Sequence, residues 1–217
     1  MRRAQYTSTG IVKRLASVYS PQQRWMKHRA DLACRIAERS GVSTIADISK
    51  DYMDMRDVYE YSSLRTRVMF ITRDCRANVW SQVRIHCETH GADARENAGD
   101  VVARSSRDWV SVNRRILRAV EGLRDEDWIH VRYEDLCRDT MSSMTRVLQF
   151  AGLEYDERVL DFEQSVEHTI ACNRVRFGGK MKAIREDLAW QDELRGDELQ
   201  VITEICAPLA TRLGYSL

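Results

Sequence analysis

The sequence predicts an α/β protein with three layers, in which a parallel sheet carries helices on both faces. Two observations lead to this prediction. Three short apolar runs have the composition of buried strands. The stretches between them carry apolar residues at helical spacing and are long enough for crossover connections. With only two prolines in 217 residues, long helices are permitted along nearly the whole chain.

The predicted strands are rich in β-branched or aromatic residues and are each followed by polar residues. They run from Thr44 to Ile48, from Val68 to Thr72 and from Trp128 to Tyr133. Ligands of parallel sheets bind beyond the carboxyl ends of the strands. The residues directly after each strand are therefore the candidates for chemistry.

Four helices are predicted from apolar spacing and from their end signals. The first runs from Gln22 to Arg39 and stops at Gly41. The apolar faces of the other three consist of Trp109, Val112, Ile116, Val120 and Leu123, then Met141, Met144, Leu148 and Ala151, then Leu199, Ile202, Cys206, Leu209 and Leu213. Gly214 follows the last of these faces and is suited to end its helix.

Composition excludes several classes of protein. The 34 basic and 33 acidic residues leave a net charge of +1, which argues against a nucleic-acid-binding surface. No run approaches the roughly 20 apolar residues of a membrane span, and the start has no secretory h-region. Six scattered cysteines without a CxxC pair argue against a metal site and a disulfide framework. We therefore expect one cytoplasmic domain over residues 1–217.

The most informative segment follows the second strand. Arg73 stands where that strand stops, and Ser81 lies eight residues later, about one turn into the predicted helix. A guanidinium offers a planar fork to phosphate oxygens, and a helix N-terminus offers free amides to an anion. The alternative is that Arg73 pairs with Asp74 or another carboxylate and that Ser81 is an ordinary helix residue. Spacing alone leaves both interpretations open.

Six segments resemble, in order, those of the sulfotransferases that use 3′-phosphoadenosine 5′-phosphosulfate (PAPS). They are TIADISK, FITRDCRANVWSQV, HVRYEDL, HTIACNRVRFGGK, DLAWQDEL and LATRLGY. The first is similar to the D-x-S-K of bacterial and Golgi-type members. The resemblance covers residues 44–217 and implies a P-loop-NTPase-like fold. It also implies transfer of a sulfuryl group from the nucleotide donor to a hydroxyl acceptor, such as a carbohydrate or small metabolite.

The resemblance implies roles for individual residues around the donor nucleotide. Arg73 and Ser81 would hold its 3′-phosphate. Tyr133 would lie by the adenine ring, although a tyrosine that anchors the strand fits the residue equally well. Glu134 and Asp135 look structural, and Asp135 is suited to cap the following helix.

The segment HTIACNRVRFGGK, which resembles a late loop of the family, carries further residues that the resemblance assigns to binding. Thr169 would lie near the adenine, and Arg174 and Arg176 would belong to a lid over the 3′-phosphate. The motif is irregular here, so which arginine makes the contact stays open. A solvated basic loop is the alternative.

The resemblance also implies that catalytic groups follow the first strand, because the corresponding strand of the cytosolic members carries them. Charge builds on the leaving phosphate oxygen, and a fixed ammonium stabilises it. Lys50 is the candidate for that role, with Ser49 beside it. The general base stays unassigned, because none of the five histidines follows this strand.

One element of the family pattern finds no match. Members begin with a strand and a loop that wraps the phosphosulfate with backbone amides, and nothing before Thr44 fits it. We therefore expect a fold that lacks this N-terminal strand and loop. A truncated, non-catalytic remnant that binds a nucleotide or a partner is the alternative function.

Overall fold

The computed structural model describes residues 21–48, 52–61, 64–160 and 185–217. The chain divides into two compact units. One comprises Met1–Val68 with Glu121–Asp127, and the other comprises Met69–Val120 with Trp128–Leu217. No described helix is both long and apolar enough to cross a lipid bilayer.

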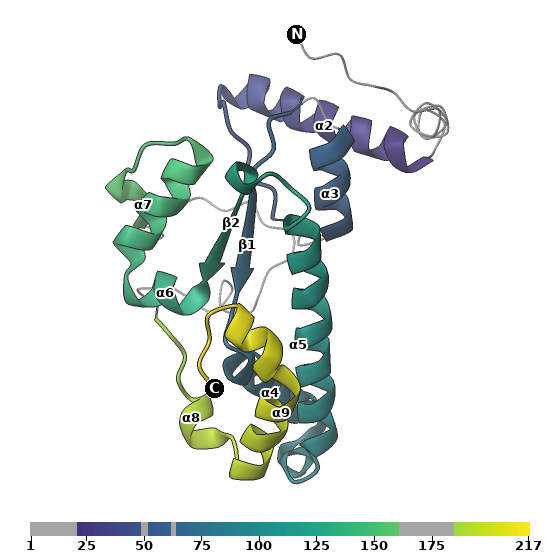
Figure 1. Ribbon diagram of the computed structural model, residues 1–217, viewed down its shortest axis with the longest axis vertical. Helices are drawn as coiled ribbons and strands as arrows, with labels where there is room; N and C mark the ends of the chain where they lie inside the picture. Colours follow the sequence, from purple (N-terminus) through teal and green to yellow (C-terminus); the bar gives the residue numbers. More distant parts are fainter. Residues whose placement is uncertain (1–20, 49–51, 62–63, 161–184) are drawn as a thin grey trace. The chain divides into compact units, whose positions relative to one another are not determined.

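The first unit contains helices α2 (Pro21–Ser40) and α3 (Tyr52–Tyr61), which pack against each other (Figure 1). The predicted end of the first helix is confirmed, because Gly41 follows it with φ +66°. The strand predicted from Thr44 to Ile48 is wrong, since these residues are irregular. A strand exists only by hydrogen bonding to a neighbour, and Ile48 is 76% exposed here.

A buried carboxylate anchors the segment Glu121–Asp127 of this unit. Asp127 is 2% exposed, and its Oδ2 accepts hydrogen bonds from the Tyr59 hydroxyl and from Arg124 Nε, both at 2.6 Å. A buried charge is tolerated only with such partners. The Tyr59 hydroxyl and then Arg124 hold the pKa of Asp127 below its ordinary value.

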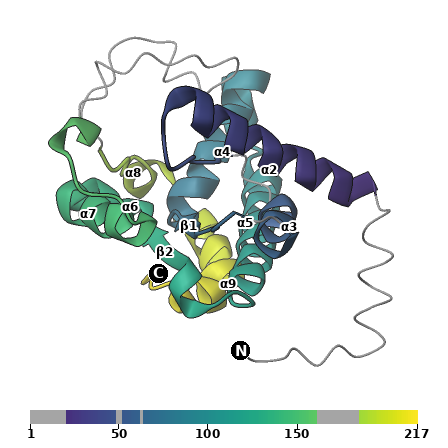
Figure 2. The same ribbon diagram turned by 90° about the horizontal axis from the view of Figure 1, so that it is seen from above.

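Together with the adjoining residue Val68, the second unit contains a parallel pair of strands and the helices around it. Its elements in chain order are β1 (Val68–Thr72), α4 (Cys75–His90), the 3₁₀ turn η1 (Ala92–Arg95), α5 (Gly99–Val120), β2 (Trp128–Arg132), α6 (Tyr133–Arg138), α7 (Thr140–Ala151), the 3₁₀ turn η3 (Glu157–Leu160), α8 (Trp190–Glu193) and α9 (Gly196–Arg212). In both views α6 and α7 lie on one side of the strands, while α5 and α9 lie on the other (Figures 1 and 2). The predicted α/β class and two of the predicted strands are thus confirmed.

The core of this unit lies where α4, α5 and α9 pack together. Val79, Val83 and Ile202 have no exposed surface, and Val102 is 1% exposed. Burying each such side chain contributes about 1.5 to 3 kcal/mol relative to exposure. The predicted face of the last helix is confirmed over its buried residues Ile202, Cys206, Leu209 and Leu213. Gly214 follows this helix with φ +81°, in agreement with its predicted role of ending the helix.

The predicted apolar face of α5 is wrong in part. Val112 is 50% exposed, whereas Ser106 and Asn113 are buried. Both polar side chains donate to backbone carbonyls one turn earlier, Ser106 to Val102 and Asn113 to Trp109, each at 2.8 Å. Because these bonds satisfy them internally, polar residues occupy core positions that an apolar pattern does not reveal.

Strand β1 is buried on one face only. Val68, Phe70 and Thr72 are at most 8% exposed, while Met69 and Ile71 are 44% and 48% exposed. Strands of parallel sheets are usually buried on both faces. The apolar run therefore predicted the strand correctly but gave no sign of this alternation.

His130 of β2 makes the fold sensitive to acid. Its Nε2 lies 2.8 Å from Thr72 Oγ1, and its ring lies 5.3 Å from that of Phe70. Burial, followed by Arg132 and Arg146, lowers its pKa. The unfolded chain therefore binds a proton that the folded chain does not, and stability falls as pH drops below about 6.5.

We expect the free energy of unfolding of His130→Gln to vary less between pH 7 and pH 5.5 than that of the wild type, as measured by urea titration. Equal slopes would contradict this expectation.

Candidate functional site

The carboxyl ends of β1 and β2 meet at one edge of the sheet. Arg73 follows β1 directly, and Tyr133 follows β2. The guanidinium carbon of Arg73 lies 5.4 Å from the centroid of the Tyr133 ring. The structure thus brings together two of the residues predicted from the strand ends, with the Arg73 side chain 29% exposed.

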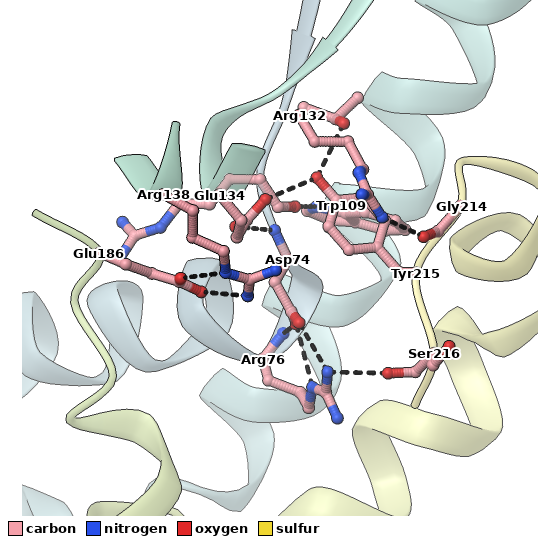
Figure 3. Close-up of polar contacts among 12 residues, drawn as sticks. Asp74, Arg76, Trp109, Arg132, Glu134, Arg138, Glu186, Gly214, Tyr215 and Ser216 are labelled. Atoms are coloured by element: carbon pink, nitrogen blue, oxygen red, sulfur yellow. Dashed lines mark hydrogen bonds and ion pairs between the residues drawn. The ribbon is translucent and has the colours of Figure 1, made fainter. Parts of the chain in front are cut away.

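The backbone that presents Arg73 is held by a buried carboxylate (Figure 3). Glu134 is 5% exposed, and its Oε1 accepts a hydrogen bond of 2.8 Å from the backbone N–H of Asp74. Its Oε2 accepts one of 3.0 Å from the hydroxyl of Tyr215. The indole Nε1 of Trp109 donates to the Arg73 carbonyl at 3.0 Å. The turn after β1 is therefore fixed from α6 and from α5, and Tyr215 of the C-terminal segment holds the Glu134 carboxylate in place.

Asp74 is paired with Arg76 rather than with Arg73. Its carboxylate accepts from the Arg76 backbone N–H at 2.8 Å, which caps α4, and from Arg76 Nη2 at 2.7 Å. The same guanidinium donates to the Ser216 carbonyl at 2.9 Å and lies 4.4 Å from the Trp190 ring centroid. Asp74 is therefore not the partner of Arg73, and the carboxylate that does lie near Arg73 is that of Asp187, 4.0 Å from Nη2.

Asp135 does not cap a helix. Both of its oxygens accept from the guanidinium of Arg132, at 2.7 and 2.8 Å. That guanidinium also donates to the Gly214 carbonyl. The predicted structural role of Asp135 holds, but the side chain ties the end of β2 to the C-terminal segment instead of binding a free helix amide.

Ser81 lies deeper in its helix than the sequence predicted. It is the seventh residue of α4, which begins at Cys75. At 3.6 residues per turn it lies nearly two turns from the start, so its hydroxyl projects from the side of the helix. The hydroxyl makes no hydrogen bond with another described residue.

Tyr133 is a protonated hydrogen-bond donor. Its hydroxyl donates to the Arg185 carbonyl at 3.3 Å. Burial raises the pKa of Tyr133 to about 12. Its phenol therefore keeps its proton at neutral pH. The tyrosine is the first residue of α6, with its ring beside Arg73, rather than a residue inside the strand.

Two charged residues at this edge were not predicted. Arg84 lies three residues after Ser81 on α4, and Asp187 precedes α8. Asp187 Oδ2 lies 4.0 Å from Arg73 Nη2 and 3.7 Å from Arg84 Nη1. Residues three apart on a helix are neighbours, so the spacing of Ser81 and Arg84 is a signal that sequence reading could have used. Asp187 has no comparable local signal.

Five predicted site residues lie outside the described residues. They are Ser49, Lys50, Thr169, Arg174 and Arg176. Among the described residues, no group of three or more His, Cys, Asp or Glu side chains is arranged to hold a metal ion. Two surface grooves of that part of the chain lie elsewhere, along α7 and along α5, and neither is lined by Arg73, Ser81 or Tyr133.

Comparisons with known proteins bear on the sequence family and on the fold. Residues 65–157 match the model of the sulfotransferase family. The solved sulfotransferase domain from the Synechococcus PCC 7002 olefin synthase is similar over 87% of this chain and 64% of that one, with a TM-score of 0.54 and 19% identity. The sulfotransferase domain from the curacin biosynthetic pathway is similar over 87% and 68%, with a TM-score of 0.51 and 14% identity.

The two solved domains bear on the fold alone, and the chain spans less than two thirds of the length of the first. A search of curated protein sequences finds no match. The likeness is to folds of the P-loop type, with a parallel sheet flanked by helices, as the sequence predicted. Residues 65–157 of this chain are thus similar to the sulfotransferase family, and the fold of the chain agrees with that similarity.

Proposed function

We propose that this protein transfers a sulfuryl group from PAPS to a hydroxyl acceptor. The observation that carries the proposal is the guanidinium of Arg73, partly exposed at the sheet edge, stacked beside Tyr133 and free of Asp74. A guanidinium in this position offers parallel N–H donors to a phosphate. The neighbouring aromatic ring offers an apolar surface to a purine.

In the proposed site, Arg73 and the Ser81 hydroxyl bind the 3′-phosphate, and Tyr133 lies beside the adenine. The candidate lid residues Arg174 and Arg176, together with Thr169, complete the nucleotide site. During transfer the bond between sulfur and the bridging phosphate oxygen breaks, and a bond between sulfur and the acceptor oxygen forms. Lys50, with Ser49 beside it, stabilises the charge left on the phosphate oxygen. The acceptor proton passes to a general base.

Calorimetry with adenosine 3′,5′-bisphosphate tests the nucleotide site. We expect binding at one site per chain, and weaker binding of adenosine 5′-monophosphate, which lacks the 3′-phosphate that Arg73 would bind. Equal affinity for the two nucleotides would contradict the assigned orientation. Absence of heat with both would refute the nucleotide site altogether.

Transfer is tested separately, with labelled PAPS and a panel of carbohydrate and small-molecule alcohols. Label in any acceptor supports the enzyme. Nucleotide binding without transfer to any acceptor supports the alternative, a non-catalytic nucleotide-binding protein.

A further inference from the structure

The carboxylate of Asp187 faces two guanidiniums at the proposed phosphate site. Its Oδ2 lies 4.0 Å from Arg73 Nη2 and 3.7 Å from Arg84 Nη1. Its other oxygen accepts a hydrogen bond of 3.1 Å from the backbone N–H of Ala189. One carboxylate oxygen therefore lies near two guanidiniums from different elements. Arg73 follows β1, and Arg84 lies in the middle of α4.

Both ion pairs are loose. At 3.7 and 4.0 Å neither arginine is within hydrogen-bond distance of the carboxylate. Other pairs of the same unit are tight, such as Arg76 with Asp74 and Arg132 with Asp135, both at 2.7 Å. Side chains this exposed are screened by water, and such pairs contribute about 0 to 1 kcal/mol. The two guanidiniums thus keep most of their capacity to bind an anion.

The position of Asp187 is nevertheless fixed. Its neighbour Glu186 accepts two hydrogen bonds from Arg138, at 2.9 and 3.1 Å (Figure 3). On the other side of Glu186, the carbonyl of Arg185 accepts from the Tyr133 hydroxyl. The segment that carries Asp187 is therefore attached to α6, so the carboxylate is held close to the two arginines.

A phosphate suits this pair of cations better than a carboxylate does. It brings up to two negative charges and three terminal oxygens, so it can accept hydrogen bonds from both guanidiniums at once. Arg84 also lies one turn from Ser81 on α4, on the same side of the helix. The hydrogen-bond donors of Arg73, Ser81 and Arg84 thus lie in one region of this unit.

We propose that Arg84 is a second cation of the 3′-phosphate site and that Asp187 is an internal anion that competes with the phosphate for it. This inference rests on the proposed function, because it assigns the same site. Binding of the nucleotide displaces the carboxylate from the two guanidiniums. The competing charge lowers affinity for a ligand that places a phosphate between the two arginines, and it does not affect a ligand without such a phosphate.

Asp187→Asn tests the competition. The amide keeps an oxygen that accepts from the Ala189 N–H, and it removes the negative charge. We expect D187N to bind adenosine 3′,5′-bisphosphate about 3- to 10-fold more tightly than the wild type, and Arg84→Gln to bind it 3- to 10-fold more weakly. Both differences shrink as the salt concentration rises. Calorimetry at 20 and 300 mM salt measures them.

Two controls isolate the effect. Asp192→Asn removes an exposed carboxylate of α8, for which no ion pair with a described arginine is found, and leaves affinity unchanged. Adenosine 5′-monophosphate has no 3′-phosphate, so D187N and R84Q bind it as the wild type does.

The outcomes separate this inference from the proposed function. If the wild type binds the bisphosphate but D187N binds it equally well or more weakly, Asp187 is not a competitor, while the nucleotide site stands. If R84Q binds like the wild type, Arg84 is not part of the site. If neither the wild type nor D187N binds the bisphosphate, the proposed function and this inference both fail.

Discussion

Replacement of Arg73 with alanine is expected to weaken binding of adenosine 3′,5′-bisphosphate by about 10- to 100-fold. A hydrogen bond to a charged group contributes about 1.5 to 3 kcal/mol, and each 1.4 kcal/mol is a factor of ten in affinity. The Arg73 side chain lies at the sheet edge and is 29% exposed, so its loss removes donors from the site without opening the core. Calorimetry measures the affinity.

The stability of the variant shows whether this effect is local. Trp109 contacts the backbone carbonyl of Arg73, which the substitution keeps. We therefore expect the free energy of unfolding to change by no more than about 0.5 kcal/mol. Arg115→Ala, which removes an exposed arginine of α5, is the matched control for charge and leaves affinity unchanged. A loss of affinity in both variants would indicate a general effect of charge, and unchanged affinity in R73A would refute the site.

Arg73→Lys refines the interpretation. Lysine keeps the charge but loses the planar fork and the stacking on Tyr133. An affinity between those of the wild type and R73A is the expected result, since the charge alone retains part of the attraction. Full affinity in R73K would show that charge is sufficient and that the geometry of the guanidinium contributes nothing.

The strands show how far local pattern predicts this fold. The runs Val68–Thr72 and Trp128–Arg132 are strands, because each has the other as its hydrogen-bonding partner. The run at residues 44–48 has a similar composition but remains irregular. β-Propensity reflects packing on a pleated, half-buried surface, and the exposed Ile48 lacks that surface. Whether a neighbour exists is a property of the whole chain that composition does not contain.

The site shows the same limit. Strand ends of a parallel sheet meet at one edge, and this rule alone predicted that Arg73 and Tyr133 would lie close together. The contacts that hold this edge were not predicted, because each of them joins residues distant in sequence. Tyr215 and Glu134 are 81 positions apart, and Trp109 and Arg73 are 36 apart. Asp187 likewise reaches Arg84 from a separate segment.

Glu134 accepts two long-range hydrogen bonds at this edge, and its replacement is expected to have the largest effect on stability. Glu134→Ala leaves the buried Asp74 N–H without its acceptor and leaves the Tyr215 hydroxyl with Thr72 Oγ1 as its remaining partner. An unsatisfied buried group costs about 1 to 3 kcal/mol, so we expect a loss of about 2 to 4 kcal/mol. For a chain of this size the corresponding decrease in Tm is roughly 5 to 12 °C, measured by circular dichroism.

Glu134→Gln tests whether the loss comes from the missing hydrogen bonds. The amide oxygen still accepts from Asp74, and the amide N–H donates to the Tyr215 oxygen. The Tyr215 hydroxyl then donates to Thr72 Oγ1, which lies 2.9 Å away. We expect this variant to lose less than half of the stability that E134A loses. Glu154→Ala, an exposed site, is the neutral control.

Binding by the alanine variant completes the test. If Glu134 fixes the turn that presents Arg73, E134A loses affinity for adenosine 3′,5′-bisphosphate even well below its Tm, whereas R73A loses affinity with stability intact. The carboxylate of Glu134 already accepts from Asp74 and Tyr215, so it acts on the ligand only through the backbone it holds. An E134A protein that is less stable but binds normally would show that the turn keeps its shape without this anchor.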